Sequence, residues 1–180
     1  MIYELKNSRN GEAAPYQTTV EITESEGCLR FVFEAEHSAY FCPHDRYNAL
    51  HADGDVCEIF ITGDPTRRHY YEMEISANGG LLLGRITHGG FEEDGTPILD
   101  LDLIDPPFIT GRVSHRRGGY TAEIRFPRSS VSDNGEELYF NAYRIETDGG
   151  ERDKHLFALN PTLCHKFHHP ECFLALKDML

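Results

Sequence analysis

Short segments in which apolar and polar residues alternate dominate this sequence and constrain its fold more than any other feature. Thr18–Glu24 reads TTVEITE, and Cys28–Glu36 reads CLRFVFEAE. Because neighbouring side chains on a β-strand point to opposite faces, this period of two is typical of strands with one buried face. The other segments with strand character are Val56–Thr62, Tyr70–Ala77, Leu81–Thr87, Phe108–His115, Tyr120–Phe126, Glu137–Glu146 and Leu156–Leu159.

Turn-forming residues separate these segments. They cluster at Gly63–Pro65, Asn78–Gly80, Gly118–Gly119, Asn134–Gly135 and Asp148–Gly150. One short helix is expected at Arg128–Ser132. About ten short strands with hardly any helix predict an all-β protein, an antiparallel β-sandwich of the jelly-roll or immunoglobulin-like kind. The 180 residues contain no internal repeat or linker, so we expect residues 1–180 to form a single domain.

The net charge of −13 narrows the classes of partner. Nucleic acids and anionic membranes attract basic surfaces, so neither is an expected partner. Neutral or cationic ligands and divalent cations are compatible with an acidic chain. The sequence favours no particular oligomeric state.

Three absences bear on the protein's location. No stretch approaches the roughly 18 to 20 consecutive apolar residues of a membrane helix. Met1–Gln17 is polar and charged, so we expect no signal peptide and a cytoplasmic protein, or an extracellular one if the chain is processed or trimmed. The five cysteines are odd in number and widely spaced, which argues against a disulfide framework.

Alternation places Glu58 and Glu72 on one outer face. In Val56–Thr62 an apolar face directed to the core is formed by Cys57, Ile59 and Ile61, and Glu58 points away from it. Tyr70, Glu72 and Glu74 similarly oppose a core face of Tyr71, Met73, Ile75 and Ala77. We expect Asn141, with Tyr139 and Tyr143, to share the outer face. Carboxylates, amides and aromatic rings suit a ligand with many hydroxyl groups.

A charged Glu58 in a partly apolar setting needs partners, because desolvating an unpaired charge is costly. Arg85, Arg144 and a ligand hydroxyl are the three candidates. The first two would give Glu58 a structural role, and the third would make it a recognition residue, which is the role we favour.

Two clusters could bind a metal. The acidic loop Glu92–Asp105 offers oxygen ligands of the kind calcium prefers, although it does not fit an EF-hand. The run CHKFHHPEC, Cys164–Cys172, offers cysteine and histidine for zinc, although its spacing is not that of a standard zinc site. We expect no obligatory cofactor, with calcium as the candidate cation.

Several ordered segments resemble a known family. They are DGDVCEIFI (Asp53–Ile61), HYYEMEISANG (His69–Gly79), AEIRFP (Ala122–Pro127), LYFNAYRIE (Leu138–Glu146) and LNPTLCHKFHHPECF (Leu159–Phe173). The last contains a Phe-His-x-Pro-x-x-Phe-like signature at Phe167–Phe173. Over nearly its whole length the chain resembles the family 9 carbohydrate-binding modules and their stand-alone relatives, a branch of the DOMON-like β-sandwiches.

The resemblance implies two antiparallel sheets and non-catalytic recognition of a sugar, often at the reducing end of a glycan. Glu58 and Glu72 match the positions whose carboxylate or amide groups hold the sugar hydroxyls. Two tryptophans sandwich the sugar in such members, but this sequence has none. The nearest flat rings are His51 before Glu58, and His155 and Phe157 before Pro161. The expected carbohydrate-binding residues are His51, Glu58, Tyr70, Glu72, Arg85, Asn141 and Phe157.

Parts of the sequence are also compatible with two other functions. Some DOMON-type sandwiches hold haem between methionine and histidine, and Met73 is the candidate ligand here, but alternation directs it into the core. A glycosidase-like enzyme would use Glu58 and Glu72 as its pair of carboxylates. No nucleophile elbow or phosphate-binding loop accompanies them.

Overall fold

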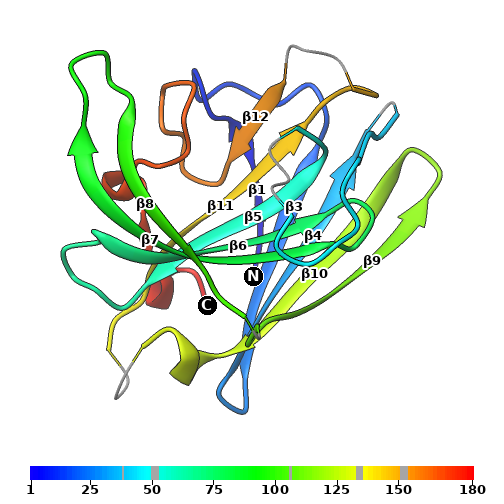
Figure 1. Cartoon of the computed structure of the whole chain (residues 1–180). Helices are drawn as coiled ribbons and strands as arrows, with labels where there is room; N and C mark the ends of the chain where they lie inside the picture. The colour runs from blue at the N-terminus through cyan, green and yellow to red at the C-terminus, as the bar shows by residue number, and fades with distance from the viewer. Residues whose placement is uncertain (38, 50–52, 106, 133–135, 151–153) are drawn as a thin grey trace.

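The computed structural model describes residues 1–37, 39–49, 53–105, 107–132, 136–150 and 154–180. Two antiparallel sheets pack face to face (Figure 1). The first has the order β1-β3-β4-β10-β9. Its strands are β1 (Ile2–Glu4), β3 (Thr18–Ser25), β4 (Cys28–Glu36), β10 (Gly119–Pro127) and β9 (Thr110–Arg116).

The second sheet has the order β2-β12-β11-β5-β6-β7-β8, and a short strand β13 also pairs with β11. Its strands are β2 (Lys6–Asn7), β12 (His155–Ala158), β11 (Tyr139–Glu146), β5 (Val56–Thr62), β6 (His69–Ser76), β7 (Leu81–Phe91), β8 (Pro97–Leu103) and β13 (Leu174–Ala175). Three single turns of 3₁₀-helix complete the described elements: η1 (Arg128–Ser130), η2 (Pro170–Cys172) and η3 (Leu176–Asp178). The predicted antiparallel sandwich is confirmed. None of the helices in the described ranges is long and apolar enough to cross a membrane.

The main core lies between the two sheets and contains the residues that alternation assigned to it. Cys57, Ile59 and Ile61 of β5 and Met73 of β6 are fully buried there. The rings of Phe31 and Phe126 stack with their centroids 6.0 Å apart. Since burying one such side chain is worth about 1.5 to 3 kcal/mol, this layer supplies most of the driving force that joins the sheets.

The acidic segment Glu92–Asp105 is not simply a loop, as the sequence suggested. Its second half is strand β8, which forms a long hairpin with β7 that projects from the molecule (Figure 1). Leu99, Leu101 and Leu103 alternate there with Asp100 and Asp102. Acidic side chains on an exposed edge strand discourage pairing with other chains, which explains why the charges and the strand pattern coincide.

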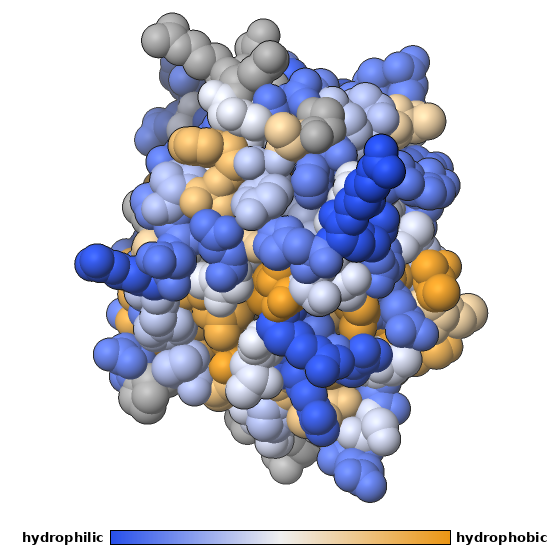
Figure 2. Space-filling model, turned by 90° about the vertical axis from the view of Figure 1, so that its right-hand side faces the viewer, coloured by the Kyte–Doolittle hydropathy of each residue, from blue (hydrophilic) through white to orange (hydrophobic). Residues whose placement is uncertain are grey.

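A second apolar cluster covers part of the outer face of the β5–β6–β11 region. Phe60, Tyr70 and Tyr143 project from these strands, and Phe167 and Phe173 of the C-terminal segment pack onto them. The chain after β12 therefore folds back over the sheet instead of ending at the sandwich edge. The side of the molecule that carries β9 and β10 differs, because its surface is mostly hydrophilic (Figure 2).

Candidate functional site

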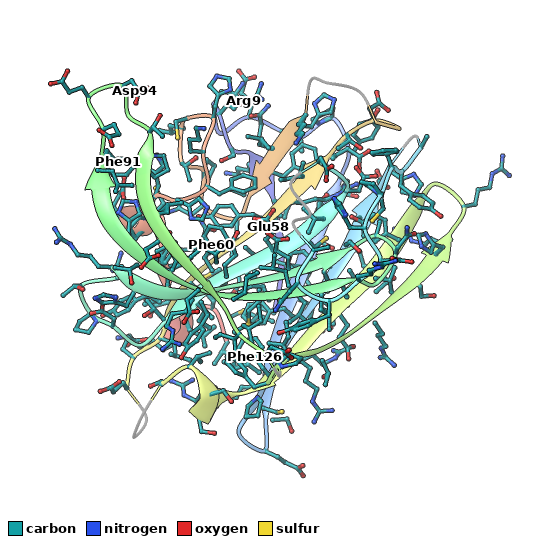
Figure 3. The ribbon with its side chains drawn as sticks, in the orientation of Figure 1. Arg9, Glu58, Phe60, Phe91, Asp94 and Phe126 are labelled. Atoms are coloured by element: carbon teal, nitrogen blue, oxygen red, sulfur yellow. The ribbon has the colours of Figure 1, made fainter. Side chains whose placement is uncertain are left out.

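Strands β5 and β6 place three glutamates together on the outer face. They pair antiparallel with Glu58 opposite Glu74 and Phe60 opposite Glu72. The side chains of Glu58, Glu72 and Glu74 therefore project from the same side of the sheet. One carboxylate oxygen from each lies within 4.8 Å of the others. Figure 3 shows Glu58 and Phe60 on this face, with Phe126 on the opposite side between the sheets.

All three carboxylates are buried. Glu58 is 3% exposed, Glu72 9% and Glu74 5%. Burial raises the pKa of Glu58 well above its ordinary value, the charges of Glu74 and Glu72 raise this pKa further, and Lys154 acts in the opposite direction. Burial likewise raises the pKa of Glu72, to which the charge of Glu74 and a side-chain hydrogen bond with Glu74 contribute. Burial and the repulsion between neighbouring carboxylates both favour the protonated forms, so this cluster holds protons more tightly than ordinary glutamates.

The arginines proposed as charge partners of Glu58 lie elsewhere. Arg144 is fully buried on the core side of β11, where it pairs with Glu146 and donates a hydrogen bond of 2.7 Å to the Thr18 hydroxyl. Arg85 of β7 points to the other face of the sheet from Glu72, and its guanidinium pairs with Asp102 at 3.0 Å. Within the described ranges no side chain forms a hydrogen bond or ion pair with the Glu58 carboxylate that would make it a structural anchor.

A glycine and two leucines border the carboxylate cluster. Gly84 of β7 pairs with Glu72 on one side and with Leu103 of β8 on the other. A Cβ at position 84 would lie only 2.4 Å from Leu101 Cδ1, so Leu101 leans over the glycine toward Glu72. Leu101 and Leu103 are 39% and 43% exposed. They form an apolar border beside the carboxylates.

Tyr70 and Asn141 lie on the predicted face but are covered. Tyr70 stacks on Phe60, and its hydroxyl lies 2.8 Å from His168 Nδ1. The Asn141 amide donates to the Asn160 carbonyl at 2.8 Å and accepts from the Asn160 N–H at 3.0 Å. Their hydrogen-bonding groups therefore hold the C-terminal segment in place. Both side chains are buried, and direct contact of either with a ligand stays a prediction.

Two other predicted contact residues lie on the face of the larger sheet opposite to the glutamates. Phe157 is fully buried between the sheets and lies 5.6 Å from the Arg144 guanidinium, so it offers no open platform. Arg85 points away from the glutamates, as described above. The structure thus brings Glu58 and Glu72 together and separates Arg85 and Phe157 from them. The remaining predicted residue, His51, lies outside the described residues.

The structure also shows where the candidate metal-binding and haem-binding residues lie. In the described ranges, the group of His, Cys, Asp or Glu side chains with metal-binding spacing is the three-glutamate cluster. The acidic side chains of Glu92–Asp105 and the Cys164–Cys172 run form no such group of three. Met73 is fully buried in the main core, where its thioether packs against apolar neighbours.

Sequence reasoning did not include Glu74 and His168 among the site residues. Glu74 follows Glu72 by two positions, so the alternation that identified Glu72 identifies Glu74 equally well. His168 stacks on Phe60 at 4.8 Å, and burial lowers its pKa to about 4. No periodicity marks His168, because it belongs to an irregular segment whose position depends on tertiary packing.

The fold and this outer-face cluster define a two-sheet sandwich with three buried carboxylates on one face of the larger sheet. No family model and no curated protein matches the sequence. A candidate carbohydrate-binding protein from Bacteroides uniformis is structurally similar, with a TM-score of 0.75, 15% identity, and coverage of 97% of this chain and 84% of that protein.

Two solved structures of a family 9 carbohydrate-binding module from Caldicellulosiruptor kristjanssonii are also similar. The complex with glucose has a TM-score of 0.59 at 16% identity and covers 96% of this chain and 82% of the module. The complex with cellotriose has a TM-score of 0.62 at 14% identity and covers 96% of this chain and 79% of the module. At these identities the comparison establishes a shared sandwich fold.

Proposed function

We propose that this protein is a non-catalytic carbohydrate-binding domain whose site is the Glu58–Glu72–Glu74 cluster on the outer face. The observation that carries the proposal is three buried carboxylates within 4.8 Å of one another. Such a cluster destabilises the folded chain, and groups of this kind concentrate at functional sites. The structural similarity to proteins that bind glucose and cellotriose supports a sugar as the ligand.

The chemistry of the cluster suits a polyol. Each ionised carboxylate accepts hydrogen bonds, and a protonated one donates, so the three groups together can serve several neighbouring hydroxyls. Hydrogen bonds to charged groups are worth about 1.5 to 3 kcal/mol each. Leu101 and Leu103 offer an apolar surface for the C–H face of a sugar ring, in the absence of tryptophan. Recognition therefore depends more on polar contacts than on aromatic stacking.

Binding is favoured over glycoside hydrolysis by the arrangement of the carboxylates. A glycosidase places its two catalytic groups on opposite sides of the scissile bond. Here Glu72 and Glu74 project from the same strand, next to Glu58, with one carboxylate oxygen of each within 4.8 Å of the others. All three carboxylates would therefore contact a ligand from the same side. Incubation with chromogenic glycosides should release no chromophore.

Titration calorimetry with glucose, cellobiose and cellotriose tests the proposal. We expect binding in the micromolar to millimolar range and a loss of roughly tenfold to a hundredfold in affinity for Glu58→Gln. Glu34→Gln is the matched control, because Glu34 lies on β4 of the other sheet with a half-exposed side chain. Absence of binding to any of a broad panel of sugars at millimolar concentration would overturn the proposal.

A divalent cation is the second candidate ligand, because the same three carboxylates have metal-binding spacing. Calorimetry with calcium, and sugar titrations repeated with calcium and with a chelator, separate the two ligands. Sugar binding that is unchanged by the chelator supports direct recognition. Calcium binding that is lost in Glu72→Gln, without any response to sugars, would favour the cation.

A further inference from the structure

The C-terminal segment brings a thiol, an imidazole and a carboxylate into line. Cys164 Sγ lies 3.1 Å from His169 Nε2, and His169 Nδ1 lies 2.7 Å from a carboxylate oxygen of Glu171. This is the order of nucleophile, base and orienting acid that activates nucleophilic side chains in proteins. The three residues lie outside the glutamate cluster, and the carbohydrate proposal does not use them.

The surrounding segment fixes this geometry. The Lys166 N–H donates to Cys164 Sγ at 3.4 Å, and the thiol lies 3.3 Å from the Lys166 carbonyl and 3.6 Å from the Thr162 hydroxyl, so the segment holds the sulfur in place. The His169 ring stacks on Phe91 with centroids 4.8 Å apart, and Phe91 is at the β7–β8 hairpin (Figure 3). η2 follows immediately and carries Glu171. Packing therefore sets the ring orientation, and Glu171 sets which ring nitrogen faces the sulfur.

The Cys164 thiol is also accessible to small reagents. Cys164 is partly exposed, whereas Cys57 is buried. Glu171 is 59% exposed, so small reagents can approach this edge of the segment. Cys42 is also partly exposed, and its thiol donates to the His44 carbonyl at 3.1 Å, as the Cys164 thiol donates to the Lys166 carbonyl at 3.3 Å. Exposure alone thus does not distinguish Cys164 from Cys42, whereas the neighbouring base does.

We propose that Cys164 is a reactive thiol, activated by His169 and Glu171, and a site of modification by hydroperoxides and other small electrophiles. The thiol proton moves to His169 Nε2, and Glu171 stabilises the imidazolium through Nδ1–H. The thiolate then attacks one oxygen of hydrogen peroxide, an S–O bond forms and the O–O bond breaks. The departing hydroxide takes the proton from His169 and leaves as water. The sulfur is oxidised to a sulfenic acid while the peroxide is reduced.

Alkylation of the native protein by iodoacetamide at pH 7, followed by mass spectrometry of each cysteine peptide, tests the proposal. We expect Cys164 to react at least about tenfold faster than Cys42, the matched control in the same molecule. Brief exposure to hydrogen peroxide with dimedone present should label Cys164 and spare Cys42. Equal alkylation rates at Cys164 and Cys42 would overturn the proposal.

Two variants separate activation from simple exposure. His169→Gln should slow alkylation of Cys164 about tenfold, and Glu171→Gln should slow it less, while Cys42 is unaffected. Burial raises the pKa of the Cys57 thiol to about 12, so its lack of reaction reports that each variant is folded. Should His169→Gln destabilise the segment, the exposed Glu171→Gln variant still decides the question. An unchanged Cys164 rate in Glu171→Gln contradicts the proposal, and so does an unchanged rate in a folded His169→Gln.

Discussion

At the scale of single residues, the glutamates on the outer face oppose folding and are the clearest sign of function. Glu58 and Glu72 lie in strands whose remaining side chains are almost all buried. Three neighbouring carboxyl groups in such a place contribute less to stability than three apolar residues would. The three glutamates therefore serve a purpose other than stability, and ligand binding is the simplest such purpose.

The pKa of Glu58 predicts how stability depends on pH. Its pKa is raised in the folded state, so its contribution to stability is fully present below about 4.5 and is lost as pH rises through the folded pKa. Glu58→Gln should therefore be more stable than the natural protein at pH 8, by at least about 1 kcal/mol, and equally stable near pH 4. His168, whose pKa is lowered to about 4, acts in the opposite sense but equally in both proteins.

Urea unfolding of both proteins at pH 4, 6 and 8 measures this difference. The sequence suggested a paired or ligand-binding Glu58, whose replacement would lower stability or leave it unchanged. The structure instead predicts stabilisation at high pH, because no arginine in the described ranges pairs with this carboxylate. A variant that is less stable than the natural protein at pH 8 would show that Glu58 has a structural partner.

At the scale of elements, the C-terminal segment is the feature that local sequence patterns describe least. Its residues cover the outer face through Phe173, which packs edge-on against Tyr70 with centroids 5.3 Å apart. Its backbone is held by Asn141 through Asn160. Tyr70 contacts residues of this segment that lie 90 or more positions away in the sequence. The periodicity of a strand cannot reveal such contacts.

Phe173→Ala tests the importance of this cover. The side chain is 3% exposed, and replacing a buried phenylalanine by alanine costs about 3 to 5 kcal/mol. We expect a correspondingly lower unfolding free energy in urea. Leu163→Ala is the control, because Leu163 lies in the same segment, is 68% exposed and should change stability by less than about 0.5 kcal/mol. A similar small effect for Phe173→Ala would mean that the segment is not firmly docked.

Strand alternation predicted most of the fold and part of the site. It placed Glu58 and Glu72 on one face because both lie in long, regular strands with an apolar face opposite. Alternation does not bear on Phe157, which the family resemblance suggests, or on Arg85, which its charge suggests. The structure places both side chains on the face of the sheet opposite to the glutamates. Strand β8 was missed because its aspartates suggested a loop, although Leu99, Leu101 and Leu103 alternate with them.

At the scale of the whole molecule, the two faces of the larger sheet have different roles. One face forms the main core with the other sheet, and the other face carries the glutamate cluster next to the docked C-terminal segment. Rigid strands thus position the carboxylates, which limits the conformational entropy lost on binding. The net charge of −13 suits neutral sugars and cations better than anionic glycans.

A crystal structure of the protein soaked with cellotriose shows directly whether the glutamate cluster is the sugar site. We expect sugar hydroxyl oxygens within about 2.5 to 3.0 Å of the carboxylates of Glu58 and Glu72, with a ring lying against Leu101 or Leu103. Glu58→Gln crystals soaked at the same concentration should show weaker or no sugar density there. Sugar bound only at another surface, or an outer face that stays free of sugar at concentrations where calorimetry detects binding, would contradict the account.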